Sequence, residues 1–168
     1  MIILRSISGS TTKILVNSTG KALKIRPDTY IEPLPDVFMV EVAVEEGQTF
    51  TLPTPNGYNY DYSVDWSDGY TSSGTTYNDT GATHTYTTAG SYVIYVRGLM
   101  EAWAVNNNTN INLLITSCIS WGNVGLKLIN FYGCTALTTL PSQTYKLSGV
   151  TTFQNFCRGC TSLVSIPY

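Results

Sequence analysis

Charged residues are scarce in this sequence. Asp, Glu, Lys and Arg make up 12% of the 168 residues, compared with roughly 25% in an average soluble domain. The formal net charge is -2, and lysine and arginine form no cluster. A protein that binds nucleic acid or an anionic membrane surface needs such a cluster to neutralise phosphates. We therefore expect no nucleic-acid partner.

Long apolar runs are missing as well. The first residues, MIILRSISGS, hold only a short apolar run, whereas a signal peptide needs ~7 to 15 apolar residues in succession. No run approaches the ~20 residues that cross a bilayer, so we expect no membrane insertion. If residue 1 is the natural start, we expect a protein that is not exported by the usual route. The alternative is a trimmed signal replaced by a methionine.

The residue patterns of common catalytic sites are also lacking. The single histidine is His84, and a Ser-His-Asp arrangement would have to combine it with Asp65 or Asp68. Neither a nucleophile elbow nor a glycine-rich oxyanion loop accompanies these residues. There is no phosphate-binding loop, no dinucleotide fingerprint and no carboxylate pair that we can place for glycan hydrolysis. We expect a protein that is not an enzyme.

The four cysteines all lie in the last third of the chain, which argues against a disulfide framework for the whole protein. Cys157 and Cys160 form a Cys-x-x-Cys pair, but Cys118 and Cys134 are too far apart to supply a second pair for zinc. Four aspartates could offer oxygen ligands to calcium, yet they lack the spacing of a calcium loop and are typical of turns. We expect no metal or cofactor. These aspartates are Asp61, Asp65, Asp68 and Asp79.

Strand-forming residues are abundant instead. Thr, Tyr and Val are frequent, with 12 tyrosines, while Ala, Glu and Lys are few. This composition favours a mainly β protein. Residues 1–35 contain the short runs MIILRS, KILVNS and ALKIR and close with the proline-rich stretch RPDTYIEPLPD. We predict a small N-terminal β arm that serves as a docking segment.

Residues 36–105 contain longer strand-like runs: VFMVEVAVEE, FTLPT, YNYDYSVDW, ATHTYTTAG and SYVIYVRG. In the last run, Ile94 and Val96 alternate with Tyr95 and Arg97, which is the period of a strand. The stretch DWSDG ends in Asp-Gly, a hairpin signal because glycine accepts a positive φ. We predict an antiparallel β-sandwich.

Residues 106–168 contain a repeat. GCTALTTLP at 133–141 returns as GCTSLVSIP at 159–167, 26 residues later. Such a period is the mark of a leucine-rich solenoid, in which each coil buries its apolar side against the next. We predict a short solenoid of about two coils, with free, buried thiols at the equivalent cysteine positions. The predicted repeat core consists of Cys134, Leu137, Leu140, Cys160, Leu163 and Ile166.

Both of the longer segments resemble known families. VDWSDG, followed by ATHTYTTAGSYVIYVRG, is similar to the PKD type of immunoglobulin-like domain, although Ser67 stands where that family usually has glycine. The repeat resembles the BspA-like leucine-rich repeats of bacterial surface proteins, a family in which a PKD-like domain often precedes the repeats. The resemblance implies a structural motif made of Asp65, Trp66, Asp68, Gly69, His84 and Tyr86.

Tyrosines are the most promising binding residues. Five of them lie on or beside the predicted hairpin, more than its interior can hold, and exposed tyrosine offers rigid contact area for glycans or proteins. The alternative is that they cover the sheet faces or contact a neighbouring subunit. The candidate binding surface is Tyr58, Tyr60, Tyr62, Tyr70 and Tyr77.

Two functions fit these observations. The first is a phage virion component, a fibre, appendage or decoration subunit at the virion surface, whose arm docks on other virion proteins. The second, which the resemblance implies, is an adhesin on the bacterial cell surface that binds a host protein or glycan. Two repeats are fewer than a solenoid normally needs, and no polar cap follows the second. Either further repeats follow in the natural protein or another subunit covers the exposed end. Both outcomes favour assembly over an isolated monomer, and we expect a homo-oligomer, with a homotrimer as the first expectation.

Overall fold

The computed structural model describes residues 3–5, 14–16, 22–24 and 36–166. The chain divides into two compact units, residues 1–34 and 35–168. In the first unit, β1 (Ile3–Arg5), β2 (Ile14–Val16) and β3 (Ala22–Lys24) form an antiparallel sheet in that order. Each of these strands falls in one of the three predicted runs. The proline-rich residues 26–35 lie outside the described residues, and with them most of the predicted docking segment.

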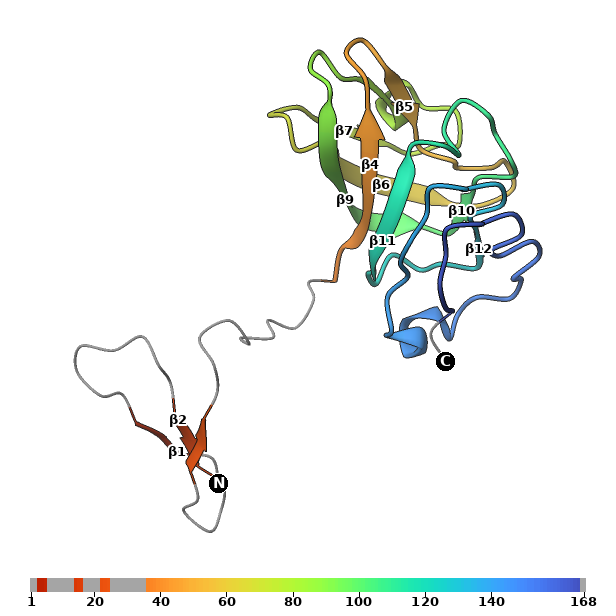
Figure 1. Cartoon of the computed structure of the whole chain (residues 1–168). Coiled ribbons are helices and arrows are strands. Elements are labelled where there is room, and N and C mark those ends of the chain that lie inside the picture. Colours follow the sequence, from red (N-terminus) through yellow and green to blue (C-terminus); the bar gives the residue numbers. More distant parts are fainter. Residues whose placement is uncertain (1–2, 6–13, 17–21, 25–35, 167–168) are drawn as a thin grey trace. The chain divides into compact units, whose positions relative to one another are not determined.

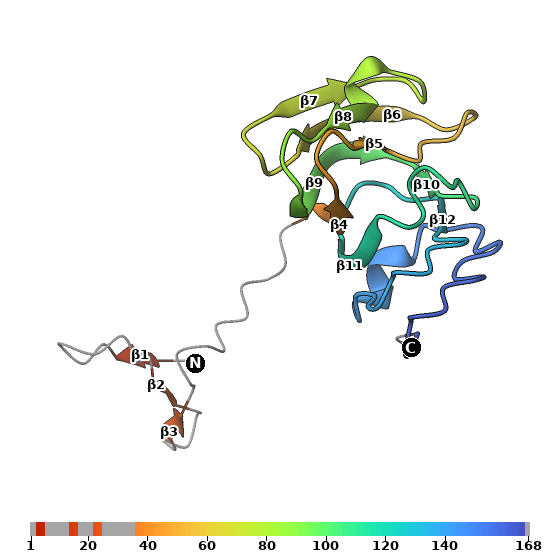
Figure 2. The same cartoon turned by 45° about the horizontal axis from the view of Figure 1, so that its top comes forward.

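The second unit is built on a five-stranded sheet with the order β11-β4-β9-β6-β7 (Figure 1), in which every neighbouring pair is antiparallel. The short strands β5 (Thr49–Thr51) and β8 (Thr83–Thr85) form a separate antiparallel pair (Figure 2). The prediction of a mainly β protein with antiparallel sheets is confirmed. The strands of the large sheet are β4 (Phe38–Val44), β6 (Tyr60–Asp65), β7 (Thr71–Gly74), β9 (Gly90–Met100) and β11 (Ile115–Trp121).

Alternating side chains place one face of the large sheet against the core. In β6, Tyr60, Tyr62 and Val64 are buried, whereas Asp61 and Ser63 are exposed. Successive residues of a strand point to opposite faces, so this alternation fixes the register of the hairpin. β9 follows the same rule, since Ile94 and Val96 are fully buried.

The predicted hairpin turn joins β6 to β7. Gly69 has a φ of 94°, and Ser67, at the position where the resembled family has glycine, has a φ of 65°. A serine in this left-handed region is strained, but the Ser67 N–H donates to Asp65 Oδ1 at 2.9 Å and its hydroxyl donates to the Val93 carbonyl at 2.6 Å. These two hydrogen bonds hold the turn against β9.

Residues 102–166 repeat one backbone pattern. β10 (Ala102–Ala104) and β12 (Leu128–Asn130) pair in parallel with an offset of 26 residues. A turn hydrogen bond recurs at the same interval, from the N–H groups of Asn108, Cys134 and Cys160 to the carbonyl three residues earlier, at 2.9, 3.0 and 3.2 Å. The segment 107–114 is therefore a third copy of the turn, ahead of the two that the sequence revealed.

Successive copies of the turn lie directly against one another. The Asn107 N–H donates to the Tyr132 carbonyl and the Gly133 N–H to the Arg158 carbonyl, both at 2.8 Å. Asn107, Gly133 and Gly159 all have a positive φ, of 58°, 83° and 77°. The chain therefore bends the same way at each copy, and in Figures 1 and 2 the C-terminal segment lies beside β10 and β12.

The core of the second unit is continuous. β11, which follows the first copy of the turn, pairs with β4 of the large sheet. A row of aromatic rings leads from the sheet into the repeats: Phe38 lies 4.9 Å from Trp103, and Trp103 lies 6.2 Å from Phe131, between ring centroids. The predicted boundary between 105 and 106 falls inside one compact unit.

Burial decreases toward the last copy of the turn. Cys134 and Leu137 are fully buried, whereas Leu140, Cys160 and Leu163 are half-buried. Ile166 is 52% exposed, so its prediction as a core residue is wrong. A residue of the middle copy is covered from both sides, and a residue of the last copy is covered from one side by the described part of the chain.

Helices are short in the described residues. The 3-10 helices η1 (Thr80–Ala82) and η2 (Thr144–Leu147) each span about one turn. None of the helices in the described ranges has the length and apolar character that crossing a membrane requires.

Gly133 provides a test of the stacked turns. A Cβ on this residue would collide with the Asn107 side chain, whereas a Cβ on Gly47, which also has a positive φ, meets nothing within 4 Å. Gly47→Ala should therefore cost about 1 to 2 kcal/mol for the backbone conformation alone. Gly133→Ala should cost a further ~1 to 3 kcal/mol for the collision. Urea denaturation of both variants measures the difference, and equal losses would argue against the stacking.

Glu101 joins the large sheet to the repeats. Its buried carboxylate accepts hydrogen bonds from Lys127 Nζ at 2.6 Å and from the Asn59 backbone N–H at 3.0 Å. The bond from Lys127, followed by that from the Asn59 backbone, lowers the pKa of Glu101. Its stabilising contribution is complete above the ordinary glutamate pKa of about 4.3. It is lost as the pH falls through the lower pKa of the folded state.

We expect Glu101→Gln to be less stable than the wild type at neutral pH, with the difference shrinking in acid. Urea denaturation at a series of pH values between neutral and acidic conditions measures this convergence. Glu46→Gln, at an exposed glutamate, is the matched control and should follow the wild-type curve. A constant difference between Glu101→Gln and the wild type at every pH would contradict this role of the carboxylate.

Candidate binding site

The residues of the predicted structural motif come together around His84. Its Nε2 lies 2.7 Å from Asp68 Oδ2, and its ring stacks on Trp66 with centroids 5.1 Å apart. Tyr86 contacts the His84 ring edge-on, with centroids 4.7 Å apart, and donates its hydroxyl proton to the Trp66 carbonyl. Trp66 and Tyr86 are fully buried. The cluster therefore ties β8 to the turn between β6 and β7.

The serines beside this cluster are engaged elsewhere. The Ser67 hydroxyl donates to the Val93 carbonyl, and the Ser72 hydroxyl donates to the Gly81 carbonyl at 2.6 Å while it accepts from Trp66 Nε1. In the described part of the chain, no serine hydroxyl is hydrogen-bonded to His84. The geometry of His84 is that of a residue that holds a turn in place.

Three of the four aspartates considered for calcium cap their own turns, whereas Asp61 is an exposed residue of β6. Asp65 Oδ1 accepts from the Ser67 N–H, Asp68 Oδ1 from the Tyr70 N–H, and Asp79 from the N–H groups of Gly81 and Thr75. The last two bonds lower the pKa of Asp79. Across residues 36–166 and the three short strands, no three His, Cys, Asp or Glu side chains converge on a common point.

The five candidate tyrosines divide into two groups. Tyr60 and Tyr62 are 5% and 3% exposed, so their prediction as surface residues is wrong. They occupy the inward positions of β6, where the period of the strand turns them into the core. Tyr58 is half-buried, and Tyr70 and Tyr77 are 62% and 43% exposed. Only these three remain available for contact with a partner.

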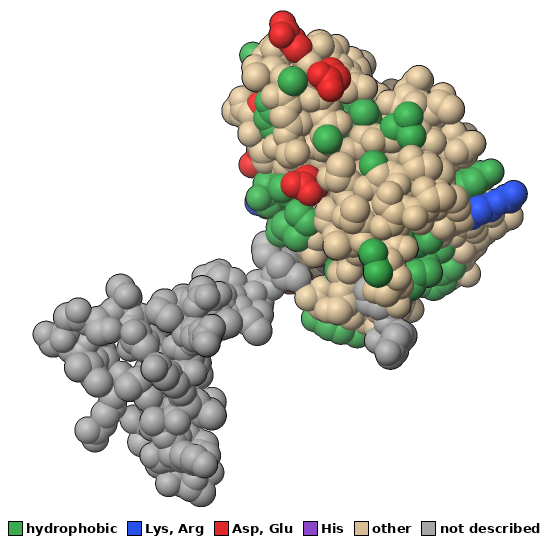
Figure 3. All heavy atoms as spheres, viewed as in Figure 1, with side chains coloured by type: hydrophobic (Ala, Val, Ile, Leu, Met, Phe, Trp, Pro, Cys, Tyr) green, Lys and Arg blue, Asp and Glu red, His purple; other side chains and the backbone are tan. Residues whose placement is uncertain are grey.

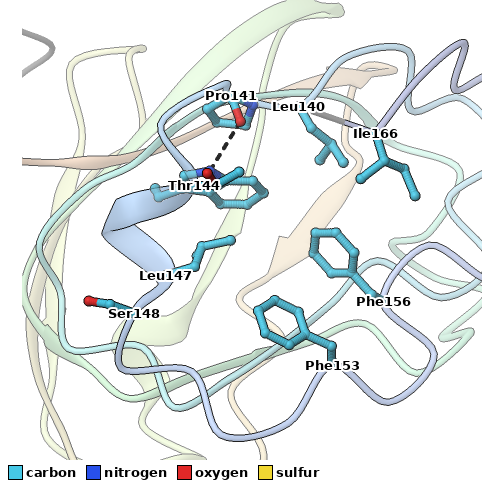
Figure 4. A pocket seen from close by; sticks show the side chains of 9 residues that line it. Leu140, Pro141, Thr144, Leu147, Ser148, Phe153, Phe156 and Ile166 are labelled. Atoms are coloured by element: carbon cyan, nitrogen blue, oxygen red, sulfur yellow. Dashed lines mark hydrogen bonds between the residues drawn. The ribbon is translucent and has the colours of Figure 1, made fainter. Parts of the chain in front are cut away.

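In the repeat segment, the described part of the surface contains an apolar pocket of about 340 Å³ (Figure 4). In Figure 4 the side chains of Leu140, Leu147 and Phe156 point toward a common space, with Phe153 and Ile166 at its margin. Trp121, from the end of β11, also lines the pocket, and its Nε1 donates to the Pro141 carbonyl at 3.2 Å. Mostly apolar walls with a few polar groups are typical of binding sites. Thr144 and Ser148 supply the polar side chains.

Most of this pocket was not predicted. Ile166 and Leu140 were assigned to the repeat core, whereas Trp121, Phe153 and Phe156 were not singled out, although the run of phenylalanines before the last turn was a usable signal. Phe153 and Ile166 are 47% and 52% exposed, and nearby Val164 is 92% exposed. We use the name last-coil surface for these three exposed apolar side chains of the last copy, Phe153, Val164 and Ile166, of which Phe153 and Ile166 line the pocket.

A second hollow is polar and uncharged. It measures about 540 Å³ and lies between the β5 strand and the first copy of the turn. Gln48, Thr49 and Thr51 line one side, and the asparagine-rich residues 108–111 line the other. Amides and hydroxyls of this kind can bind sugar hydroxyls. The face of the molecule in Figure 3 likewise shows few charged side chains.

Comparisons of the chain with protein-family models, with curated proteins and with solved structures found no match.

Removing the hydroxyl group of Tyr60 and removing that of Tyr62 should have different effects on the free energy of unfolding. The Tyr60 hydroxyl donates to the Pro55 carbonyl at 2.7 Å. The Tyr62 hydroxyl is buried with no partner in the described residues, and burial raises its pKa to about 12. Tyr60→Phe should therefore lower the free energy of unfolding by about 1 kcal/mol, whereas Tyr62→Phe should leave it unchanged or raise it. Denaturant titration compares the two, and equal losses would contradict this assignment.

Proposed function

We propose that this chain is a non-enzymatic structural and adhesion protein, a phage virion component that assembles with copies of itself and displays its second unit. The observation that carries this proposal is the last-coil surface, whose apolar side chains are exposed: Phe153 47%, Val164 92% and Ile166 52%. Exposed apolar side chains gathered in one part of a surface are typical of protein interfaces.

Two finer assignments of fold belong to the proposal. The first is a PKD-like sandwich, supported by the way in which Trp66, His84 and Tyr86 meet at the hairpin turn. The second is a leucine-rich-repeat solenoid, supported by the parallel pairing of β10 with β12 and by the turn hydrogen bonds that recur every 26 residues. With the copy at 107–114, the solenoid has three coils, which meets the number that such stacks need.

Each of the two units has its own proposed role. The first unit, residues 1–34, is the docking part, and the second unit, residues 35–168, carries the display surfaces. Low charge supports a structural role, because it leaves apolar and hydroxyl contacts as the main means of association. The proposed partners are other virion proteins and further copies of this chain, with a homotrimer as the expected assembly.

A bacterial cell-surface adhesin is the second candidate function. The polar hollow beside β5 favours it, since its uncharged amides and hydroxyls suit a glycan of the host surface. The exposed Tyr70 and Tyr77 could add aromatic contacts to sugars or proteins. The genomic neighbourhood separates the two candidates: capsid and tail genes alongside support the virion component, whereas a signal peptide encoded upstream of this sequence and an anchor encoded downstream of it support the adhesin.

Light scattering of the purified protein tests the assembly. We expect a homotrimer in the wild type. Val164→Asp and Ile166→Asp should weaken association by about 100-fold or more, because an interface then buries an unpaired carboxylate at a cost of several kcal/mol. Leu113→Asp is the matched control, since Leu113 is 58% exposed but lies in the first copy of the turn. A wild-type protein that stays monomeric at every concentration would contradict the proposal.

A further inference from the structure

The turn of the last copy brings two cysteine side chains close together. The Cys160 N–H donates to the Cys157 carbonyl at 3.2 Å, which closes a four-residue turn. A turn of this kind holds its first and last Cα atoms less than ~7 Å apart. A disulfide requires Cα atoms ~4.4 to 6.8 Å apart. The backbone of this turn therefore suits a bond between the two sulfurs.

The other two cysteines lie in a different environment. Cys118 and Cys134 are fully buried, and burial raises the pKa of both thiols well above the ordinary range. Cys157 and Cys160 are only half-buried, and all four cysteines are free thiols. A small reagent in solution can therefore reach the pair in the last turn and is excluded from Cys118 and Cys134.

The two thiols of the pair are not equivalent. When Cys160 is neutral, its S–H donates to the Phe131 carbonyl at 3.1 Å. When Cys160 is ionised, its sulfur accepts hydrogen bonds from the Cys157 thiol and from the Cys134 backbone N–H, and these bonds lower the pKa of Cys160. The same thiol–thiol bond, together with burial, raises the pKa of Cys157. Cys160 is thus the better nucleophile and Cys157 the proton donor beside it.

We propose that Cys157 and Cys160 form a reactive dithiol site that exchanges with small disulfides and closes to an intramolecular disulfide in the last turn. The Cys160 thiolate attacks one sulfur of the small disulfide, forms a mixed disulfide and releases the other half as a thiolate. Cys157, once deprotonated, attacks the Cys160 sulfur and releases the second half. One small disulfide is reduced to two thiols, and the two protein thiols are oxidised to one disulfide.

Closure of so short a loop changes the unfolded chain little, so we expect the site to act by its reactivity and to add little stability. Cys160 is equivalent in position to Cys134, which belongs to the copy before it. The buried thiol of Cys134 serves as a core residue, whereas the described part of the chain leaves the equivalent Cys160 only half-buried and open to reaction. This inference does not depend on the proposed virion role.

Glutathione disulfide is the probe that tests the site. The full-length protein is reduced, freed of reductant, incubated with the probe and then alkylated, and its peptides are analysed by mass spectrometry. We expect the peptide that contains Cys157 and Cys160 to lose two hydrogen atoms and to carry neither glutathione nor alkyl groups. Cys118 and Cys134 should remain reduced, which also shows that the protein stayed folded during the reaction.

Single variants separate the two roles. Cys157→Ser should accumulate glutathione on Cys160, because the residue that resolves the mixed disulfide is gone. Cys160→Ser should form no intramolecular disulfide and can carry glutathione only on Cys157, since the partner sulfur is gone. Cys134→Ala is the control and should close the pair as the wild type does. A stable mixed disulfide on the wild type, a bond between Cys134 and Cys160, or a folded protein in which neither thiol reacts would overturn the proposal.

Discussion

The second half of the chain depends on one repeated backbone contact. N–H groups of one turn donate to carbonyls of the next copy, from Asn107 to Tyr132 and from Gly133 to Arg158. The residue at this contact has a positive φ in each copy, a conformation that glycine and asparagine tolerate best. Between the middle and last copies, the aromatic rings of Phe131 and Phe156 meet edge-on with centroids 6.4 Å apart.

The same stacking is connected to the large sheet. β11 leaves the first copy of the turn and pairs with β4, and Trp103 of β10 packs between Phe38 and Phe131. Glu101 adds a buried carboxylate that is bound from both sides of this junction. The sheet and the repeats therefore share one core, and we expect them to unfold together.

The position of a residue in the stack determines its chemistry. Ile111 and Leu137 are buried in the first and middle copies, whereas the equivalent Leu163 is only half-buried. Cys134 and Cys160 differ in the same way. The last copy thus combines the apolar surface proposed for assembly with the dithiol proposed to react. Both properties arise because the described part of the chain covers the equivalent side chains of successive copies to different extents.

The sequence by itself determined the strands β1–β6, β8 and β9, the hairpin turn and the 26-residue interval, because each of these depends on local periodicity or on a residue that tolerates a positive φ. Only the tertiary structure decided which tyrosines are exposed, since the direction of β6 relative to the core buries Tyr60 and Tyr62. It also identified the copy at 107–114, where asparagines replace the Gly-Cys pair and hide the repeat. The apolar pocket joins β11 to residues 140–166, and contacts over such separations follow from packing that no local pattern encodes.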